Sequence, residues 1–367
     1  MIEKLQLENF TAFRQANLKF SPGLNVFVGE NGTGKTHLLK LGYLFCNAWS
    51  NLMKSESTLS KQRTEEYLGI RLKELFKPDK IGNLTYSSGN GKTVVSTDVV
   101  GAIPTIHIHM PHEKPGVPLP EPMSWKITFS NRSEKNVSVE KLPGEAAINA
   151  FVSQSVYLPT KEIISFFDGF KEVARKYSLQ FDETYLDLAD NLSLPELKQR
   201  PELLHTQLQV LNTAVGGNII LKNGRFYVST KETKNREITL VAEGMRKIAT
   251  LLYLINNGSL AKGGTLFWDE PEANLNPRLV KLVAETIYSL ANEGVQVVLA
   301  THSLFLLREL EILGKKNEFK KVSSRFFALE QTKNGVSVTQ GDNVDEIDPI
   351  IMLDEALQQS DRFLDEA

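Results

Sequence analysis

The sequence FWDEPEANLNP, residues 267–277, places two acids directly after an apolar run. Residues 265–268 carry no charge, which predicts a short strand buried on both faces, as in parallel sheets. Asp269 and Glu270 then lie at the carboxyl end of that strand, where open α/β sheets bind ligands. Because buried carboxylates without a partner are costly, we expect a positive group beside them. The alternative is a structural acid pair that caps a helix, with Pro271 in its first turn.

A glycine-rich segment near the N-terminus can supply that positive charge. Residues 24–28 predict a strand, and GENGTGKT follows at residues 29–36, which matches the phosphate-loop pattern G-x-x-x-x-G-K-[ST]. The glycines let successive N–H groups point at an anion, and the next helix adds the positive end of its dipole. The residues expected to contact the nucleotide are Gly29, Glu30, Asn31, Gly32, Thr33, Gly34, Lys35 and Thr36.

This loop and the acid pair together predict a bound triphosphate and a Mg²⁺ ion. Lys35 can reach the β- and γ-phosphates, and the Thr36 hydroxyl can ligate the metal. Asp269 is expected to hold the same ion, directly or through water. Glu270 is expected to orient or deprotonate the attacking water.

A third strand is predicted at residues 295–300, and Thr301, His302 and Ser303 follow it. A histidine at the end of a strand is more often a structural residue than a catalytic one. Beside a phosphate loop and an acid pair, however, we expect His302 to reach the γ-phosphate or the attacking water.

The composition bounds the setting of this chemistry. The chain has 367 residues, of which 41% are hydrophobic and 23% charged, and its formal net charge is -2. These values are ordinary for a soluble globular protein and give no global basic field. We expect no membrane span, because no run of about 18 apolar residues occurs, and no signal peptide. A single cysteine, Cys46, favours a reducing, cytoplasmic location.

The order of the phosphate loop, FWDEP and ATHS (residues 300–303) resembles the ABC-type ATPase heads. Within that group the run DEPEANLNP resembles the overcoming-lysogenization-defect (OLD) and RecF-like ATPases of the bacterial AAA family. Residues 2–36, 155–166 and 240–260 share this likeness. The resemblance implies an α/β fold of the P-loop NTPase class, similar to an ABC-ATPase head, and a Mg²⁺-dependent ATPase that forms a homodimer or higher homo-oligomer through ATP.

The resemblance also assigns roles in a dimer. Residues 241–245, VAEGM, occupy the place of the signature segment, where the N–H of Gly244 would approach a phosphate bound to a second subunit. Ala242 stands where the pattern usually has serine, so Arg246 or Lys247 is expected to assist. An ordinary helix start is the alternative. Residues 274–276 would form the loop that crosses the dimer interface.

Two further parts of the chain are assigned by the same resemblance. Phe13 and Arg14, on the first hairpin, would flank the adenine, and a solvated hairpin tip is the alternative. The segment 157–162 would couple the nucleotide to the lobes, with Thr160 and Lys161 better placed than Gln154.

The remaining segments predict lobes added to the ATPase core. An antiparallel β lobe and a helical lobe are expected to be inserted in it. The expected limits are 1–60 and 238–345 for the core, 61–160 for a β-hairpin-rich lobe that completes the head, 161–237 for a helical lobe with a hairpin, and 346–367 for a C-terminal helical tail.

Three clusters of metal- or phosphate-binding residue types are interpreted as a strand edge or as solvated segments. They are His107, His109 and His112, then Asp342, Asp345 and Asp348, and finally the lysine-rich residues 315–321.

These observations favour an ATP-driven switch. Only a short tail follows His302, without the acid constellation of a nuclease, so the resemblance implies a separately encoded effector, a nuclease or a toxin of an anti-phage defence module. The alternative is a RecF-like DNA-binding ATPase of recombination or repair, which leaves nucleic acid open as a partner. A subunit of a membrane transporter fits the hairpin-rich segment less well.

Overall fold

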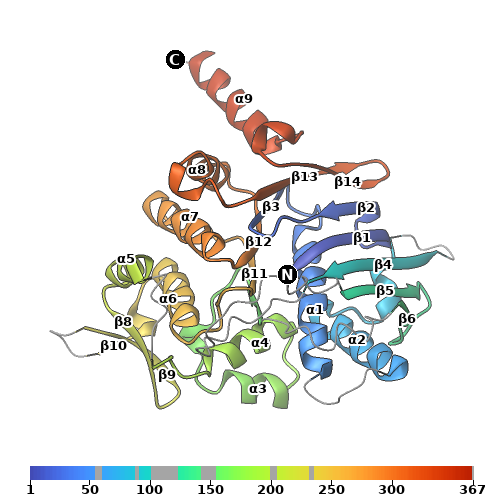
Figure 1. Cartoon of the computed structure of the whole chain (residues 1–367), viewed down its shortest axis with the longest axis horizontal. Coiled ribbons are helices and arrows are strands. Elements are labelled where there is room, and N and C mark those ends of the chain that lie inside the picture. Colours follow the sequence, from blue (N-terminus) through green and yellow to red (C-terminus); the bar gives the residue numbers. More distant parts are fainter. Residues whose placement is uncertain are drawn as a thin grey trace, which may run out of the picture.

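The computed structural model describes residues 1–53, 60–86, 91–100, 123–141, 154–198, 205–230 and 235–365. A six-stranded sheet at the centre has the strand order β14-β13-β3-β12-β11-β7 (Figure 1). Its strands are β3 (Leu24–Gly29), β7 (Ser155–Leu158), β11 (Thr265–Asp269), β12 (Gln296–Thr301), β13 (Ser324–Thr332) and β14 (Gly335–Gly341). All neighbours pair in parallel except β13 and β14, which are antiparallel. The sheet is therefore mixed, with an antiparallel strand at one edge.

The central strands are buried on both faces because their side chains alternate between two apolar cores. Val26 of β3 and Val297 of β12 lie in one core, whereas Phe27 and Val298 lie in the other. Every residue of β3, β11 and β12 is buried. This explains why these strands read as continuous apolar runs rather than as an alternating pattern.

Two smaller antiparallel sheets flank the central one. Five strands in the order β2-β1-β4-β5-β6 form the first, and three strands in the order β10-β9-β8 form the second. The first contains β1 (Ile2–Phe10), β2 (Phe13–Lys19), β4 (Lys92–Val99), β5 (Met123–Ser130) and β6 (Ser138–Lys141), and the second β8 (Asn218–Lys222), β9 (Arg225–Ser229) and β10 (Arg236–Glu237). Because β1 pairs with both β2 and β4, the N-terminal hairpin and the strands after residue 91 share one sheet.

Helices cover both faces of the central sheet (Figure 1). On one side α1 packs with the five-stranded sheet in the core that contains Phe27, and on the other side α6, α7 and α8 contribute to the core that contains Val26. The helices are α1 (Lys35–Met53), α2 (Lys61–Phe76), α3 (Phe170–Lys176), α4 (Glu183–Leu192), α5 (His205–Val215), α6 (Glu243–Asn256), α7 (Pro277–Asn292), α8 (Leu304–Gly314) and α9 (Ile351–Asp365).

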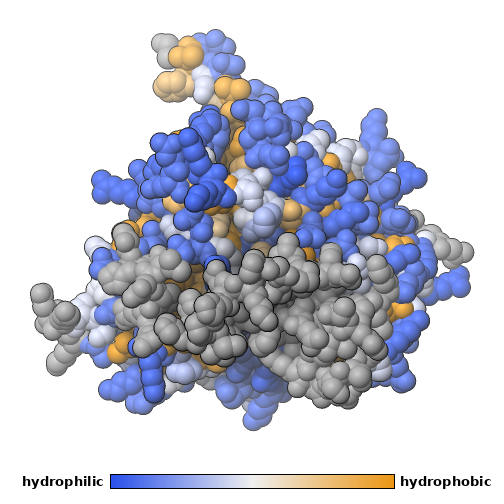
Figure 2. Space-filling model, viewed as in Figure 1, coloured by the Kyte–Doolittle hydropathy of each residue, from blue (hydrophilic) through white to orange (hydrophobic). Residues whose placement is uncertain are grey.

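The C-terminal helix α9 stands away from this layered body. None of its residues is buried, and Leu357, Phe363 and Leu364 are 55%, 74% and 72% exposed. Figure 2 shows apolar colouring on this helix at the top of the molecule. No helix in the described ranges has both the length and the apolar content needed to cross a bilayer.

The predicted α/β class is confirmed, and the strands predicted at 24–28, 265–268 and 295–300 are β3, β11 and β12. The inserted segments contain the antiparallel strands and the helices that we expected. The proposed domain limits remain a prediction. His107, His109 and His112 lie outside the described residues.

Candidate functional site

Three neighbouring strands of the central sheet bring the predicted site residues together. The order β3-β12-β11 is parallel throughout, so the three carboxyl ends lie at one edge. The phosphate loop follows β3, the acid pair Asp269 and Glu270 ends β11, and His302 follows β12. Segments more than 230 residues apart in sequence thus meet, as the Thr36–Asp269 hydrogen bond shows.

The phosphate loop holds its lysine in a self-contained arrangement. Lys35 is only 6% exposed, and its Nζ donates hydrogen bonds of 2.7 Å to the carbonyl oxygens of Gly29 and Glu30. Burial lowers the pKa of Lys35, against the raising effect of Glu270, Asp269, Glu272 and Glu30. The two carbonyl oxygens hold the ammonium group in the loop, where it can exchange them for phosphate oxygens, which are stronger acceptors.

Gly34 shows why the loop needs glycine. Its φ is +85°, and a Cβ there would lie 2.8 Å from the ring of Phe13, so both backbone conformation and space exclude a side chain.

Phe13 itself is fully buried beneath the loop. The prediction that Phe13 flanks the adenine is therefore wrong in this structure, because its ring is part of the core. Arg14 is exposed, next to it on the same hairpin.

Thr36 and Asp269 make the contact expected of a magnesium pair. The Thr36 hydroxyl donates a 2.8 Å hydrogen bond to Oδ2 of Asp269, and Asp269 is 7% exposed. Burial raises the pKa of this carboxyl, whereas the bond from Thr36 opposes the rise. A hydroxyl and a carboxylate oxygen are hard donors of the kind that Mg²⁺ takes beside phosphate oxygens. The residues present therefore fit the ion.

Glu270 and His302 form the second polar pair of the site. Nδ1 of His302 lies 3.1 Å from Oε1 of Glu270, and the two side chains are 48% and 25% exposed. Glu270 has a left-handed backbone with φ of 48°, which a residue other than glycine adopts at a cost of about 1–3 kcal/mol. The carboxylate is thus held at the open side of the site, where water and substrate have access.

The start of α6 is fixed to the loop that follows Glu270. Gly244 is buried, and a Cβ there would lie 2.6 Å from the carbonyl oxygen of Asn274. The Asn274 side chain donates a 2.8 Å hydrogen bond to Glu243. Contacts within its own chain therefore require a glycine at position 244. The contact of Gly244 with a phosphate bound to a partner remains a prediction. Ala242, the N-cap, makes no side-chain cap bond.

The two cations expected to assist Gly244 are engaged within the chain. Arg246 forms a 3.2 Å ion pair with Glu162, and Nζ of Lys247 donates a 2.9 Å hydrogen bond to the carbonyl oxygen of Glu270. Lys161 is exposed, so Glu162 rather than its neighbours joins the end of β7 to α6. Gln154 is hydrogen-bonded instead to Asn191.

Sequence reasoning missed Glu162 and Glu272. Glu272 is 9% exposed and accepts a 2.6 Å hydrogen bond from Thr301 Oγ1, so it joins the ends of β11 and β12. The sequence did carry a signal for Glu272, because this acid follows the acid pair by two residues in a loop at the edge of the sheet.

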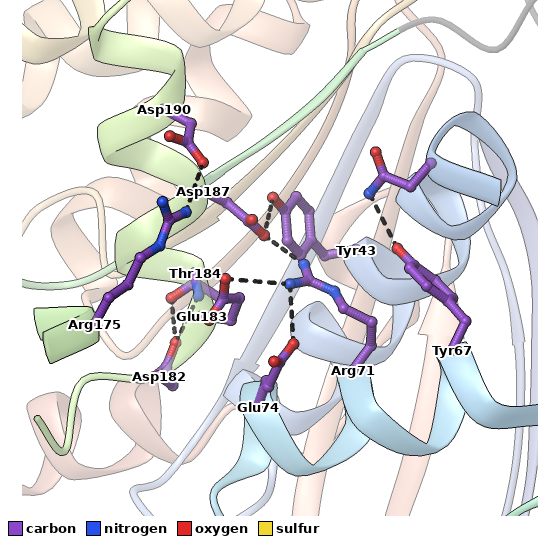
Figure 3. Close-up of polar contacts among 11 residues, drawn as sticks. Tyr43, Tyr67, Arg71, Glu74, Arg175, Asp182, Glu183, Thr184, Asp187 and Asp190 are labelled. Atoms are coloured by element: carbon purple, nitrogen blue, oxygen red, sulfur yellow. Dashed lines mark hydrogen bonds and ion pairs between the residues drawn. The ribbon is translucent and has the colours of Figure 1, made fainter. Parts of the chain in front are cut away.

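A network of charged and polar side chains joins α2 and α4 to α1, the helix that follows the phosphate loop (Figure 3). Arg71 of α2 is 2.5 Å from Asp187 and 3.6 Å from Glu183, both on α4. Tyr43 of α1 donates a 2.8 Å hydrogen bond to the same Asp187. One turn nearer the loop, Lys40 pairs with Asp182 at 2.8 Å. The phosphate-loop helix is therefore tied to the helical segment at two levels.

We expect Arg71→Ala to lower the free energy of unfolding by about 3 kcal/mol, because it removes a buried cation and leaves the partly buried carboxylates of Asp187 and Glu183 without it. Urea unfolding measures this loss. Arg175→Ala is the matched control, since its pair with Asp190 at 3.6 Å is about half exposed and should contribute less than about 1 kcal/mol. Equal losses for the two variants would contradict the importance of the buried network.

The aspartate and lysine clusters make surface contacts. Asp342 pairs with Arg325 at 3.2 Å, and Lys315 pairs with Glu311 within α8 and its C-cap. Within the described ranges, no group of three or more His, Cys, Asp or Glu residues is arranged to hold a metal ion. Asp342, Asp345 and Asp348 are all exposed, as we expected for a solvated turn.

Solved structures with a similar architecture include heads of SMC proteins. One is an SMC head bound to the C-winged helix domain of ScpA. Its alignment with this chain covers 94% of this chain and 98% of the SMC head, with a TM-score of 0.54 and 13% identity. An SMC head with an extended coiled coil, bound to a ScpA domain derived from Pyrococcus furiosus, gives a TM-score of 0.51 at 13% identity over 99% of both chains. At such identity the likeness shows the fold alone, and it confirms the predicted ABC-head-like architecture.

Sequence comparison finds short matches to curated relatives. The DNA replication and repair protein RecF of Alkaliphilus oremlandii is 34% identical over 77 residues, 20% of this chain and 21% of the relative. RecF of Renibacterium salmoninarum is 52% identical over 44 residues, 12% of this chain and 11% of the relative. The chain thus matches about a fifth or less of the length of these proteins.

Two family models match the chain. One, described as "AAA ATPase domain", matches residues 1–155. The other, described as "AAA domain, putative AbiEii toxin, Type IV TA system", matches residues 118–308, which is slightly more than half of the 367 residues. With this match beside a phosphate loop that faces an acid pair, the chain belongs to that family of AAA domains.

Proposed function

We propose that the chain is a Mg²⁺-dependent ATPase whose two copies close around ATP and thereby control a separately encoded effector. The observation that carries the proposal is the meeting of Lys35 and Thr36 with Asp269, Glu270 and His302 at one sheet edge. Family membership supports nucleotide binding and ATP hydrolysis. A cytoplasmic setting fits the single free cysteine.

The residues of the chain divide the chemistry among them. Lys35 and the N–H groups of residues 29–36 bind the phosphates. Thr36 and Asp269 would hold Mg²⁺, which would neutralise negative charge on the phosphate oxygens. Glu270 accepts a proton from the water that attacks the γ-phosphorus, and the bond between that phosphorus and the β–γ bridging oxygen breaks. The products are ADP and inorganic phosphate.

The dimer is proposed from the open side of the site and from the resemblance to ABC-type heads. His302 and Glu270 are partly exposed. At the start of α6, Ala242 and Glu243 are exposed, and the buried Gly244 follows them in the sequence. A second copy that presents this turn to the γ-phosphate would complete the site and exclude water. ATP would then favour the closed pair, and hydrolysis would separate it.

The effector is proposed to be a nuclease or a toxin of an anti-phage defence module, as the resemblance of the sequence to OLD-like ATPases suggests. The description of the matching family, which mentions a toxin–antitoxin system, supports a setting in which the ATPase acts with a second protein. A RecF-like role in DNA repair is the second candidate, and the RecF matches favour it.

Measurement of ATP turnover with possible partners separates these candidates. We expect the product of a neighbouring gene to form a stable complex in ATP or a transition-state analogue and to change the turnover rate. Duplex DNA and RNA serve as the comparison, at several salt concentrations, because phosphate contacts weaken steeply as salt increases. Salt-sensitive stimulation by DNA, without any protein partner, would favour the RecF-like role instead.

A further inference from the structure

A buried lysine connects α6 to Glu270, the proposed general base of the same chain. Lys247 is 5% exposed, and its ammonium group, which has three donors, makes one side-chain hydrogen bond in the described part of the chain, to the carbonyl oxygen of Glu270 at 2.9 Å. Burial lowers the pKa of Lys247, whereas the carboxylates of Glu272, Glu270, Glu243 and Asp269 raise it. The ammonium group therefore has further N–H donors that a nearby carboxylate could accept.

One of those acids has a free acceptor. Glu272 is buried, and only its Oε1 has a partner, the hydroxyl of Thr301. Its Oε2 is buried without a hydrogen bond, which is costly for a carboxylate unless a cation lies near. Glu272 lies two residues beyond the Glu270 carbonyl that Lys247 holds, so its orphaned Oε2 offers the ammonium group a second acceptor.

The loop from Glu270 to Asn274 is attached to the start of α6. Both of these end residues have left-handed backbones, with φ of 48° and 63°. The carbonyl oxygen of Asn274 leaves no room for a side chain at Gly244, and the Asn274 side chain donates a hydrogen bond to Glu243. Hydrogen bonds of Glu243 and Lys247 thus attach α6 to this segment at Asn274 and at Glu270, and we expect a shift of α6 to displace the backbone of Glu270.

We propose that Lys247 is a positioning residue that reports the position of α6 to the carboxylate of Glu270, with Glu272 as the alternative acceptor of its ammonium group. In the present structure the ammonium holds the Glu270 carbonyl. When the start of α6 binds a nucleotide held by the second copy, the ammonium turns to Glu272 and Glu270 takes its working position. This inference rests on the proposed ATP dimer, and it adds the residues of one chain, Lys247 and Glu272, that connect its partner-facing turn to Glu270.

Steady-state kinetics test the proposal. We expect turnover by the unmodified protein to depend on ATP with a Hill coefficient approaching the limit of about 2 for two coupled sites. Lys247→Met should bring the coefficient to about 1 and lower kcat by about 10–100-fold, as expected for a misplaced reacting group. ATP affinity, measured with a fluorescent nucleotide, should change little. Lys281→Met, an exposed lysine on α7, is the matched control.

A second variant keeps the test independent of folding. Glu272→Gln retains the bond from Thr301 but removes the charge, and it should reproduce the kinetic defect. The double variant should be no worse than either single one, because the two residues act on one step. Additive losses, or a lower kcat with an unchanged Hill coefficient, would overturn the proposal. Absence of an ATP-dependent dimer in the Glu270→Gln background would instead overturn the proposed function.

Discussion

Lys35→Ala should abolish measurable ATP turnover. Its ammonium group is the cation of the phosphate loop, and it is held 2.7 Å from two loop carbonyls, where it can exchange these acceptors for phosphate oxygens. Loss of one preorganised donor in a buried site lowers a rate by about 10²–10³, and here ground-state binding is lost as well. We therefore expect weak nucleotide binding in equilibrium titration and no release of phosphate above background.

The control for this variant is Lys320→Ala. Lys320 is exposed after α8, and its removal should leave both binding and turnover unchanged. Thermal unfolding of Lys35→Ala checks that the loop carbonyls of Gly29 and Glu30, which lose their partner, do not unfold the protein. A folded Lys35→Ala protein that binds and hydrolyses ATP normally would remove the phosphate loop from the proposed mechanism.

The central part of the site could be predicted because its signals are local. Lys35 and Thr36 belong to one contiguous pattern, and Asp269, Glu270 and His302 each follow an apolar run long enough to be a buried strand. Parallel strands place their carboxyl ends at one edge of a sheet, so three separate predictions become one site. The bonds between Thr36 and Asp269 and between Glu270 and His302 realise that expectation.

The other contacts of the site depend on how segments distant in the sequence pack together. The periodicity of hydrophobic residues carries no information on such packing. Phe13 is buried because the first hairpin pairs with β4 and lies against Gly34, although its position near a turn suggested exposure. Arg71 and Asp187 are 116 residues apart, and either alone resembles a solvated helix residue. Gly244 was assigned to a partner's phosphate, but its contact with Asn274 became visible only in three dimensions.

Glu270→Gln should retain ATP and accumulate as a dimer. Glutamine preserves the size of the side chain and an oxygen that can accept from His302 at 3.1 Å, but it cannot take a proton from water. Loss of a general base lowers a rate by about 10²–10⁴, whereas the phosphate-binding groups remain in place. Size exclusion with light scattering should show twice the monomer mass in ATP and the monomer mass in ADP.

The same column run with Lys35→Ala/Glu270→Gln is the control, since a protein that does not bind ATP should stay monomeric. Because glutamine and glutamate have similar backbone preferences, the left-handed conformation with φ of 48° should cost both residues about equally. A fall in stability therefore cannot explain a loss of turnover, and unfolding in urea checks this. A Glu270→Gln protein that is strictly monomeric in ATP and as active as the unmodified protein would refute both the role of this carboxylate and the dimer.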